Sequence, residues 1–161
     1  MRRHPRLVLL ALALAAAPLV PSHRAAAATD PCTIVTPADV QAVFGFSAAP
    51  LTLGSGDLVR CAYNKPDGSM VITALAKSDL KSAADVRSFT GGTMTERPGV
   101  GVIAFESVGR QSDLVVLGQR GAFELLLNTG TRNIPVPKAE HELLVALAKR
   151  VAGGSSASSA S

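Results

Sequence analysis

Residues Asp113–Thr129, DLVVLGQRGAFELLLNT, give the clearest indication of the architecture. Two apolar runs, LVVL and FELLL, lie on either side of Gly118-Gln119-Arg120, which has the composition of a tight turn. The runs are apolar at consecutive positions, so both faces of each strand are buried, as in central strands that helices cover. The stretch therefore predicts a β-hairpin of strands Asp113–Leu117 and Gly121–Thr129.

The segments around this hairpin alternate between helix and strand patterns. The expected elements, in chain order, are a helix over Thr36–Gly45, strands Asp57–Lys65 and Ser69–Lys77, a helix over Ser78–Phe89, a short strand Met94–Arg97, a strand Val102–Val108, the hairpin, and a helix over Pro137–Ala152. Apart from the short strand Met94–Arg97, the order is α-β-β-α-β-β-β-α, which predicts an α+β domain. We expect one mainly antiparallel sheet of about five strands with helices packed on it.

The first helix carries clear signals at both ends. Thr36 is a suitable N-cap, and Asp39 can reach back to the amide of that cap. Val35 and Val40 stand at the two positions of a hydrophobic staple, and Gly45 is a typical C-terminal stop. We expect this helix to bury Val40, Val43 and Phe44.

The two later helices show apolar stripes at helical spacing. In the middle helix the expected inward side chains are Leu80, Ala83, Ala84, Val86 and Phe89. In the last helix they are Leu143, Leu144, Leu147 and Val151. Lys149 and Arg150 suit the negative end of the last helix, and Gly153 follows as a stop.

The two ends of the chain do not belong to the folded domain. Residues 1–28 combine a basic start, a short apolar run and a closing set of alanines, which predicts a secretory signal peptide cleaved near Ala28. The apolar run is too short to span a bilayer, so we expect no transmembrane segment in the mature chain. Residues 153–161, GGSSASSAS, predict a disordered tail. A single domain at residues 29–152 remains, in a secreted or cell-envelope protein.

The charge of the mature chain argues against nucleic acid as a partner. The whole chain has 16 basic and 12 acidic residues and a net charge of +4, but four of the basic residues belong to the signal. The mature domain is therefore near neutral, without the basic surface that nucleic acid requires. Two of the three histidines also leave with the signal, so only His141 stays.

The two cysteines, Cys32 and Cys61, suggest three uses. In an exported chain the simplest is a disulfide between them. A lipid anchor at Cys32 fits less well, because the preceding Thr29-Asp30-Pro31 does not resemble a lipobox. A nucleophilic thiol needs a base or a lowered pKa, and the one mature histidine is far away in sequence.

Motifs for catalysis are weak. Gly99–Ala104 matches a G-x-G-x-x-A spacing, but a β-branched run follows it instead of a helix, so we expect a turn. His141-Glu142 lacks the second histidine of a zincin helix, and we expect His141 to be an ordinary surface residue flanking the apolar stripe. Two carboxylates could converge in the fold, but the sequence singles out no pair. We expect no cofactor and no metal.

Several landmarks together resemble a known family. They are Pro31–Thr36, the helix end Phe44-Gly45, Cys61-Ala62-Tyr63, Pro66-Asp67-Gly68, the Pro98–Gly101 turn with Ala104-Phe105, Leu114–Leu117 and the closing leucine helix. In this order they resemble a family of small secreted proteins and lipoproteins of mycobacteria and other actinobacteria that is catalogued as a domain of unknown function. The resemblance implies an envelope or extracellular location and a Cys32–Cys61 disulfide. The layout is also similar to the sandwich of photosystem accessory proteins.

The sequence is compatible with three functions. The first is a non-catalytic binding or accessory module, whose partner is an unknown envelope protein or a small apolar ligand. The second is a carrier of an apolar, lipid-like ligand held between sheet and helices. The third is a hydrolase that uses His141 or a carboxylate pair.

Overall fold

The computed structural model describes residues 30–55 and 59–153. The predicted signal peptide and nearly all of the predicted tail lie outside these residues. The elements, in chain order, are α1 (Pro31–Ile34), α2 (Pro37–Phe44), β1 (Leu51–Leu53), β2 (Arg60–Asn64), β3 (Val71–Ala76), α3 (Ala83–Thr90), β4 (Thr95–Glu96), β5 (Ile103–Val108), β6 (Gln111–Gly118), β7 (Gly121–Asn128), η2 (Gly130–Arg132) and α4 (Lys138–Ala152). Within these residues, no helix has the length and apolar character needed to cross a bilayer.

The described strands form one sheet of seven, in the order β1-β2-β3-β7-β6-β5-β4. Every neighbouring pair is antiparallel. The predicted hairpin is β6–β7, which pairs from Gln111 opposite Asn128 to Gly118 opposite Gly121 and lies at the centre of the sheet. The predicted α+β class with an antiparallel sheet is confirmed.

The expectation of about five strands is wrong, because a short strand lies at each edge of the sheet. β1 has three residues, which are too few to show a clear alternation of apolar and polar positions. β4 has two residues and lies within the predicted short strand Met94–Arg97. The strand predicted to start at Asp57 starts at Arg60 in the structure, and Asp57 and Leu58 lie outside the described residues.

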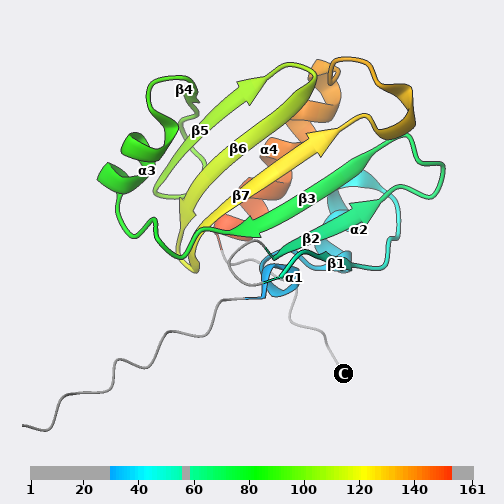
Figure 1. Ribbon diagram of the computed structural model, residues 1–161, viewed down its shortest axis with the longest axis horizontal. Helices are drawn as coiled ribbons and strands as arrows, with labels where there is room; N and C mark the ends of the chain where they lie inside the picture. The colour runs from blue at the N-terminus through cyan, green and yellow to red at the C-terminus, as the bar shows by residue number, and fades with distance from the viewer. Residues whose placement is uncertain (1–29, 56–58, 154–161) are drawn as a thin grey trace, which may run out of the picture.

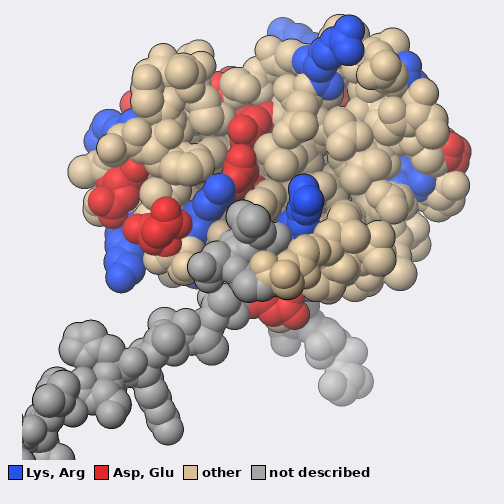
Figure 2. All heavy atoms as spheres, viewed as in Figure 1, with Lys and Arg blue, Asp and Glu red and all other residues tan. Residues whose placement is uncertain are grey.

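Helices cover the two faces of the sheet unequally (Figure 1). α1, α2 and α4 pack on one face, which we call the helix face. Its core includes Val40, Ile72, Leu114, Leu125, Leu127, Leu144 and Leu147. On the other face α3 contacts β5 and β6, over a smaller core of Leu80, Val86, Ile103, Val115 and Ala122. We call this second face the open face, and Figure 2 shows acidic side chains near its centre.

The predicted start of the first helix is confirmed in detail. Thr36 and Asp39 form a capping box, and Val35 and Val40 are both fully buried. Asp39 also accepts a hydrogen bond from Arg150 Nε at 2.7 Å, which ties α2 to the last turn of α4. Burial raises the pKa of Asp39, but the hydrogen bonds from Arg150 and Thr36 outweigh it, and the net pKa lies below the usual value.

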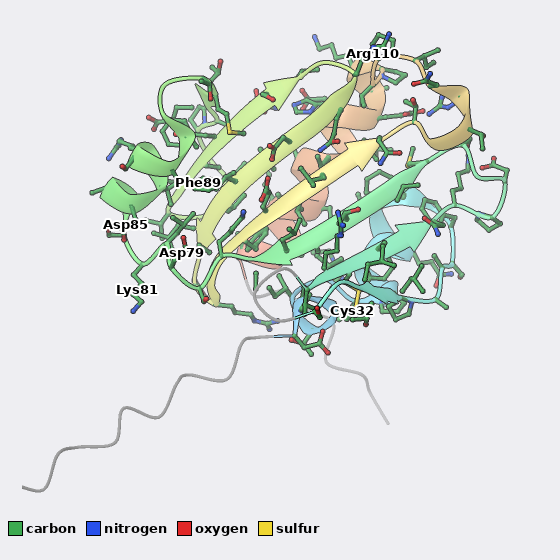
Figure 3. The ribbon with its side chains drawn as sticks, viewed as in Figure 1. Cys32, Asp79, Lys81, Asp85, Phe89 and Arg110 are labelled. Carbon is green, nitrogen blue, oxygen red and sulfur yellow. A yellow bond between two sulfur atoms is a disulfide. The ribbon has the colours of Figure 1, made fainter. Side chains whose placement is uncertain are left out.

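The predicted helix Ser78–Phe89 is correct in type but starts too early. Ser82 and Asp85 form a capping box, so α3 begins at Ala83. Phe89, labelled in Figure 3, is 46 % exposed and does not point into the core as expected. Its ring instead lies 4.6 Å from Lys77 Nζ, in a cation–π contact.

The apolar face of α4 is confirmed with one correction. Leu144, Leu147 and Val151 are buried, but Leu143 is 36 % exposed. Its expected place in the buried face is taken by residues on the other side of the stripe, among them His141, Val145 and Ala148. The stripe is therefore rotated about the helix axis relative to the prediction.

The predicted disulfide is present, and it joins α1 to β2. Cys32 and Cys61 are bonded with a Cα–Cα distance of 5.1 Å, and Cys32 lies beside β1 at the edge of the molecule (Figure 3). Next to it the Tyr63 hydroxyl donates a hydrogen bond to the Val35 carbonyl. These two links fix the start of the domain to the sheet, and the pairing leaves neither thiol free to act as a nucleophile.

We predict that breaking the disulfide strongly destabilises the domain. The bond closes a loop with a sequence separation of 29. A loop of this size restricts the unfolded chain enough to stabilise the fold by about 3–4 kcal/mol. Urea unfolding of the Cys32→Ser, Cys61→Ser double variant should show this loss, and wild type in reductant should match it. An unchanged unfolding midpoint in reductant would contradict the prediction.

Candidate functional site

His141 is buried near the start of α4, and the prediction of a surface histidine is wrong. Its side chain is 4 % exposed. Its Nε2 lies 3.0 Å from Glu106 Oε2 on β5. Glu106 lies on the helix face, so it gives a polar partner to a ring at the edge of the apolar stripe. A histidine in that position can then be buried without a large loss of hydrogen bonding.

Arg97 connects the same glutamate to a second one. Its guanidinium lies 3.3 Å from Glu106 Oε1 and 2.7 Å from Glu142 Oε2. Arg97 directly follows β4, and its backbone N–H donates to the Ala104 carbonyl at 2.8 Å. A network of charge-assisted hydrogen bonds thus ties the β4–β5 edge of the sheet to the start of α4.

A cleft of about 410 Å³ opens beside this network. The described residues that line it are Arg97, Glu106, Val108, Val136, Lys138, His141 and Glu142. Its polar side is the ion-pair network, and the two valines form an apolar side. Binding sites for small molecules commonly combine an apolar wall with a few fixed polar groups.

The His141 ring, which lines this cleft, has one unsatisfied atom. Its Nδ1 is buried and has no hydrogen-bond partner among the described residues. When Nε2–H donates to the ionised Glu106, Nδ1 carries a free lone pair. A buried polar atom without a partner is costly, and a hydrogen-bond donor that reached this nitrogen would remove that cost.

A second polar cluster lies on the open face, and we call it the carboxyl pair. Asp113 on β6 makes a side-chain hydrogen bond with Glu124 on β7. Burial, and then the charge of Glu124, raise the pKa of Asp113 to about 7. Lys77 Nζ lies 2.6 Å from Glu124 Oε2 and balances one of the two charges. The structure thus selects one pair of acids, where the sequence had selected none.

Parts of both clusters could be found from sequence signals. Glu124 interrupts an apolar strand, and His141 is the sole histidine of the domain, so both stood out in the pattern. Their partners did not stand out. Arg97 and Glu106 are brought to His141 by the β4–β5 pairing and by the packing of α4, which no local pattern reveals.

The remaining predicted features carry no site. The Gly99–Ala104 motif forms a turn that leads into β5, as expected, and no helix opens there. In the described part of the chain, no group of three or more histidine, cysteine or acidic side chains is placed to hold a metal ion. Comparisons with protein-family models, curated proteins and solved structures find no match to this chain.

We predict that the carboxyl pair makes stability fall as pH rises. The pKa of Asp113 is about 7 in the fold, against 3.8 as its ordinary value. Between these values the folded state binds more protons than the unfolded state, so the free energy of unfolding decreases with rising pH. The loss should be about 1–2 kcal/mol, since solvent screens this partly exposed group.

Thermal melts from pH 4 to pH 8 test this prediction. The asparagine of Asp113→Asn cannot ionise, so the free energy of unfolding of this variant should fall less between pH 4 and pH 8. At pH 8 the variant should therefore gain stability relative to wild type. Asp79→Asn is the matched control, because Asp79 lies on an exposed loop before α3 (Figure 3) and should follow wild type. Parallel curves for wild type and Asp113→Asn would contradict the assignment.

Proposed function

We propose that the mature chain is a non-catalytic binding module that holds a small ligand in the cleft at His141. The observation that carries this proposal is a lined cleft beside the buried His141 ring, whose Nδ1 lacks a hydrogen-bond partner among the described residues. The polar groups around it are already held in place by Arg97, so a ligand would not need to order them. Such preorganisation lowers the entropy cost of binding.

The packing of the core favours a ligand at the start of α4 over one between α4 and the sheet. The interface between the helix face and α4 is filled by leucines, including Leu114, Leu125, Leu144 and Leu147. A carrier of an apolar ligand, our alternative, would therefore hold its ligand at the cleft, where Val108 and Val136 supply an apolar surface.

Hydrolysis is a second candidate, and one observation favours it. The Glu106–His141 pair has the arrangement of a carboxylate that orients an imidazole base. The described residues lining the cleft include no serine or cysteine, so the nucleophile would be water or a glutamate carboxylate. Turnover of any substrate that both His141→Gln and Glu106→Gln abolish, with folding intact, would favour hydrolysis over simple binding.

We propose that this module works outside the cytosol, as a secreted or cell-envelope protein. The signal-like sequence of residues 1–28 and the Cys32–Cys61 disulfide support this location. The resemblance to the actinobacterial family of secreted proteins and lipoproteins supports it too. An envelope protein that supplies or receives the ligand is the expected partner.

A fragment titration followed by NMR tests the binding function. Small molecules of diverse chemistry should shift the amides of residues 106–109, 136 and 138–142 more often than others. Val108→Trp should remove these shifts, because Val108 is 56 % exposed and its enlarged side chain would fill the cleft without disturbing the core. Val102→Trp is the matched control, at an exposed valine near the other end of α4.

Two outcomes would overturn the binding proposal. In the first, no small molecule shifts the amides at the cleft. In the second, the shifts persist unchanged in Val108→Trp. Equal loss in both tryptophan variants would also count against it, because the effect would then not depend on filling the cleft.

A further inference from the structure

A second hollow adjoins the cleft at the edge of the sheet. The pairing of β4 with β5 includes Thr95 opposite Glu106 and goes no further along β5. Beside this point lies a hollow of about 400 Å³, lined by Thr93, Thr95, Glu106, Ser107 and Val108. We call it the hydroxyl hollow, because three of these side chains carry a hydroxyl. Glu106 and Val108 also line the cleft, so one ligand can contact both depressions.

The hydroxyls of this hollow have bonding capacity left for a ligand. The side chains of Thr95 and Ser107 form no hydrogen bond within the described residues. The Thr93 hydroxyl donates to the Thr90 carbonyl at 2.7 Å, so its lone pairs remain available. A hydroxyl can donate one hydrogen bond and accept two. The hydroxyl hollow therefore suits a ligand whose own groups both donate and accept.

The backbone of Val108 adds a donor and an acceptor at the same place. The Arg97 N–H donates to the Ala104 carbonyl at 2.8 Å, so the backbone groups of every second residue from Ala104 point toward the β4 edge. Glu106 meets Thr95 there, but at Val108 the pairing with β4 has ended. No other described strand lies along this edge of β5. The N–H and carbonyl of Val108 therefore face the edge without a strand partner.

An extended peptide suits this edge poorly. A peptide that adds a strand to a sheet uses a row of free backbone groups. Here β5 ends at Val108, and the carbonyl of the next residue, Gly109, already accepts from the Val136 N–H at 2.9 Å. The free backbone groups are thus too few for a strand, but they can bind a small polar molecule.

The charges of the adjoining cleft favour a neutral ligand. Arg97 and Lys138 balance Glu106 and Glu142, so the side chains that line the cleft carry no net charge when His141 is neutral. Arg97 contacts both glutamates and holds them in place, while their remaining lone pairs can still accept from a hydroxyl. The unsatisfied Nδ1 of His141 is an acceptor, so it favours a ligand that donates over an anion.

We infer that the ligand is a neutral saccharide, and this inference rests on the proposed function. Its hydroxyls bind Thr95, Ser107 and the backbone of Val108, and its apolar C–H groups lie along Val108 and Val136. An apolar ligand would instead cover the hydroxyls and leave them unpaired, which is costly. The described residues that line the two depressions include no aromatic ring for a sugar to stack on, so the binding is weak.

Matched sets of sugars test the inference. Wild type is titrated with glucose, glucuronate and glucosamine, with the same three forms of galactose, and with maltose, cellobiose and lactose, and binding is followed by amide shifts. At least one neutral sugar should shift the amides of residues 95, 107 and 108. It should bind at least as tightly as its charged forms, because the cleft has no net charge. It should also bind more tightly than 1-hexanol, which has a single hydroxyl.

Removal of single hydroxyls locates the binding in the hydroxyl hollow. Thr95→Ala and Ser107→Ala should each weaken the binding of that sugar about 2–10-fold, as expected for the loss of one hydrogen bond. Neither hydroxyl is bonded within the described fold, so Tm should stay at the wild-type value. Ser47→Ala is the matched control, at an exposed serine in the segment that leads to β1 at the opposite edge of the sheet, and should bind like wild type.

The outcomes separate this inference from the function beneath it. If other fragments bind at the cleft and no sugar does, only this inference fails. Sugar binding that neither Thr95→Ala nor Ser107→Ala weakens would also overturn it, because the hydroxyl hollow would then not be used. A charged sugar that binds about tenfold more tightly than its neutral form would overturn the neutral ligand. If neither sugars nor fragments bind there, the proposed function fails as well.

Discussion

The packing of α4 against the β6–β7 hairpin is the contact on which the other features depend. Leu144 and Leu147 are fully buried against Leu114 and Leu125 of the central strands. Burying side chains of this kind contributes about 1.5–3 kcal/mol each, which is the largest favourable effect available to a domain of this size. Because α4 spans the helix face, its rotation and position decide what its two ends meet.

Each end of α4 meets a different neighbour through charged side chains: α2 at one end and the edge of the sheet at the other. At its last turn Arg150 donates a hydrogen bond to Asp39, whose side chain also belongs to the capping box of α2. At its first turns His141 and Glu142 meet the Glu106–Arg97 network from the β4–β5 edge. The contact between Arg150 and Asp39 joins two helices. The Glu106–Arg97 network joins α4 to the sheet but leaves a cleft beside it. We propose that this cleft holds the ligand.

Local signals predicted most of the fold and little of the site. The capping box of Thr36 and Asp39, the β6–β7 hairpin and the leucine stripe of α4 all depend on residues close in sequence. The cleft depends on Arg97, which lies 45 residues before its partner Glu142. The burial of His141 was missed because a helical wheel shows the edge of a stripe but not the carboxylate that lies opposite. Short β1 was missed because three residues carry almost no periodicity.

The two edges of the sheet have a consequence for how the protein behaves at high concentration. An edge strand offers unpaired backbone groups that can pair with another molecule and start aggregation. Here one edge strand has three residues and the other has two, so each offers only a brief template. The long, apolar strands β6 and β7, which would be the most dangerous templates, are enclosed at the centre. The order of the strands thus protects the chain against polymerising through its own sheet.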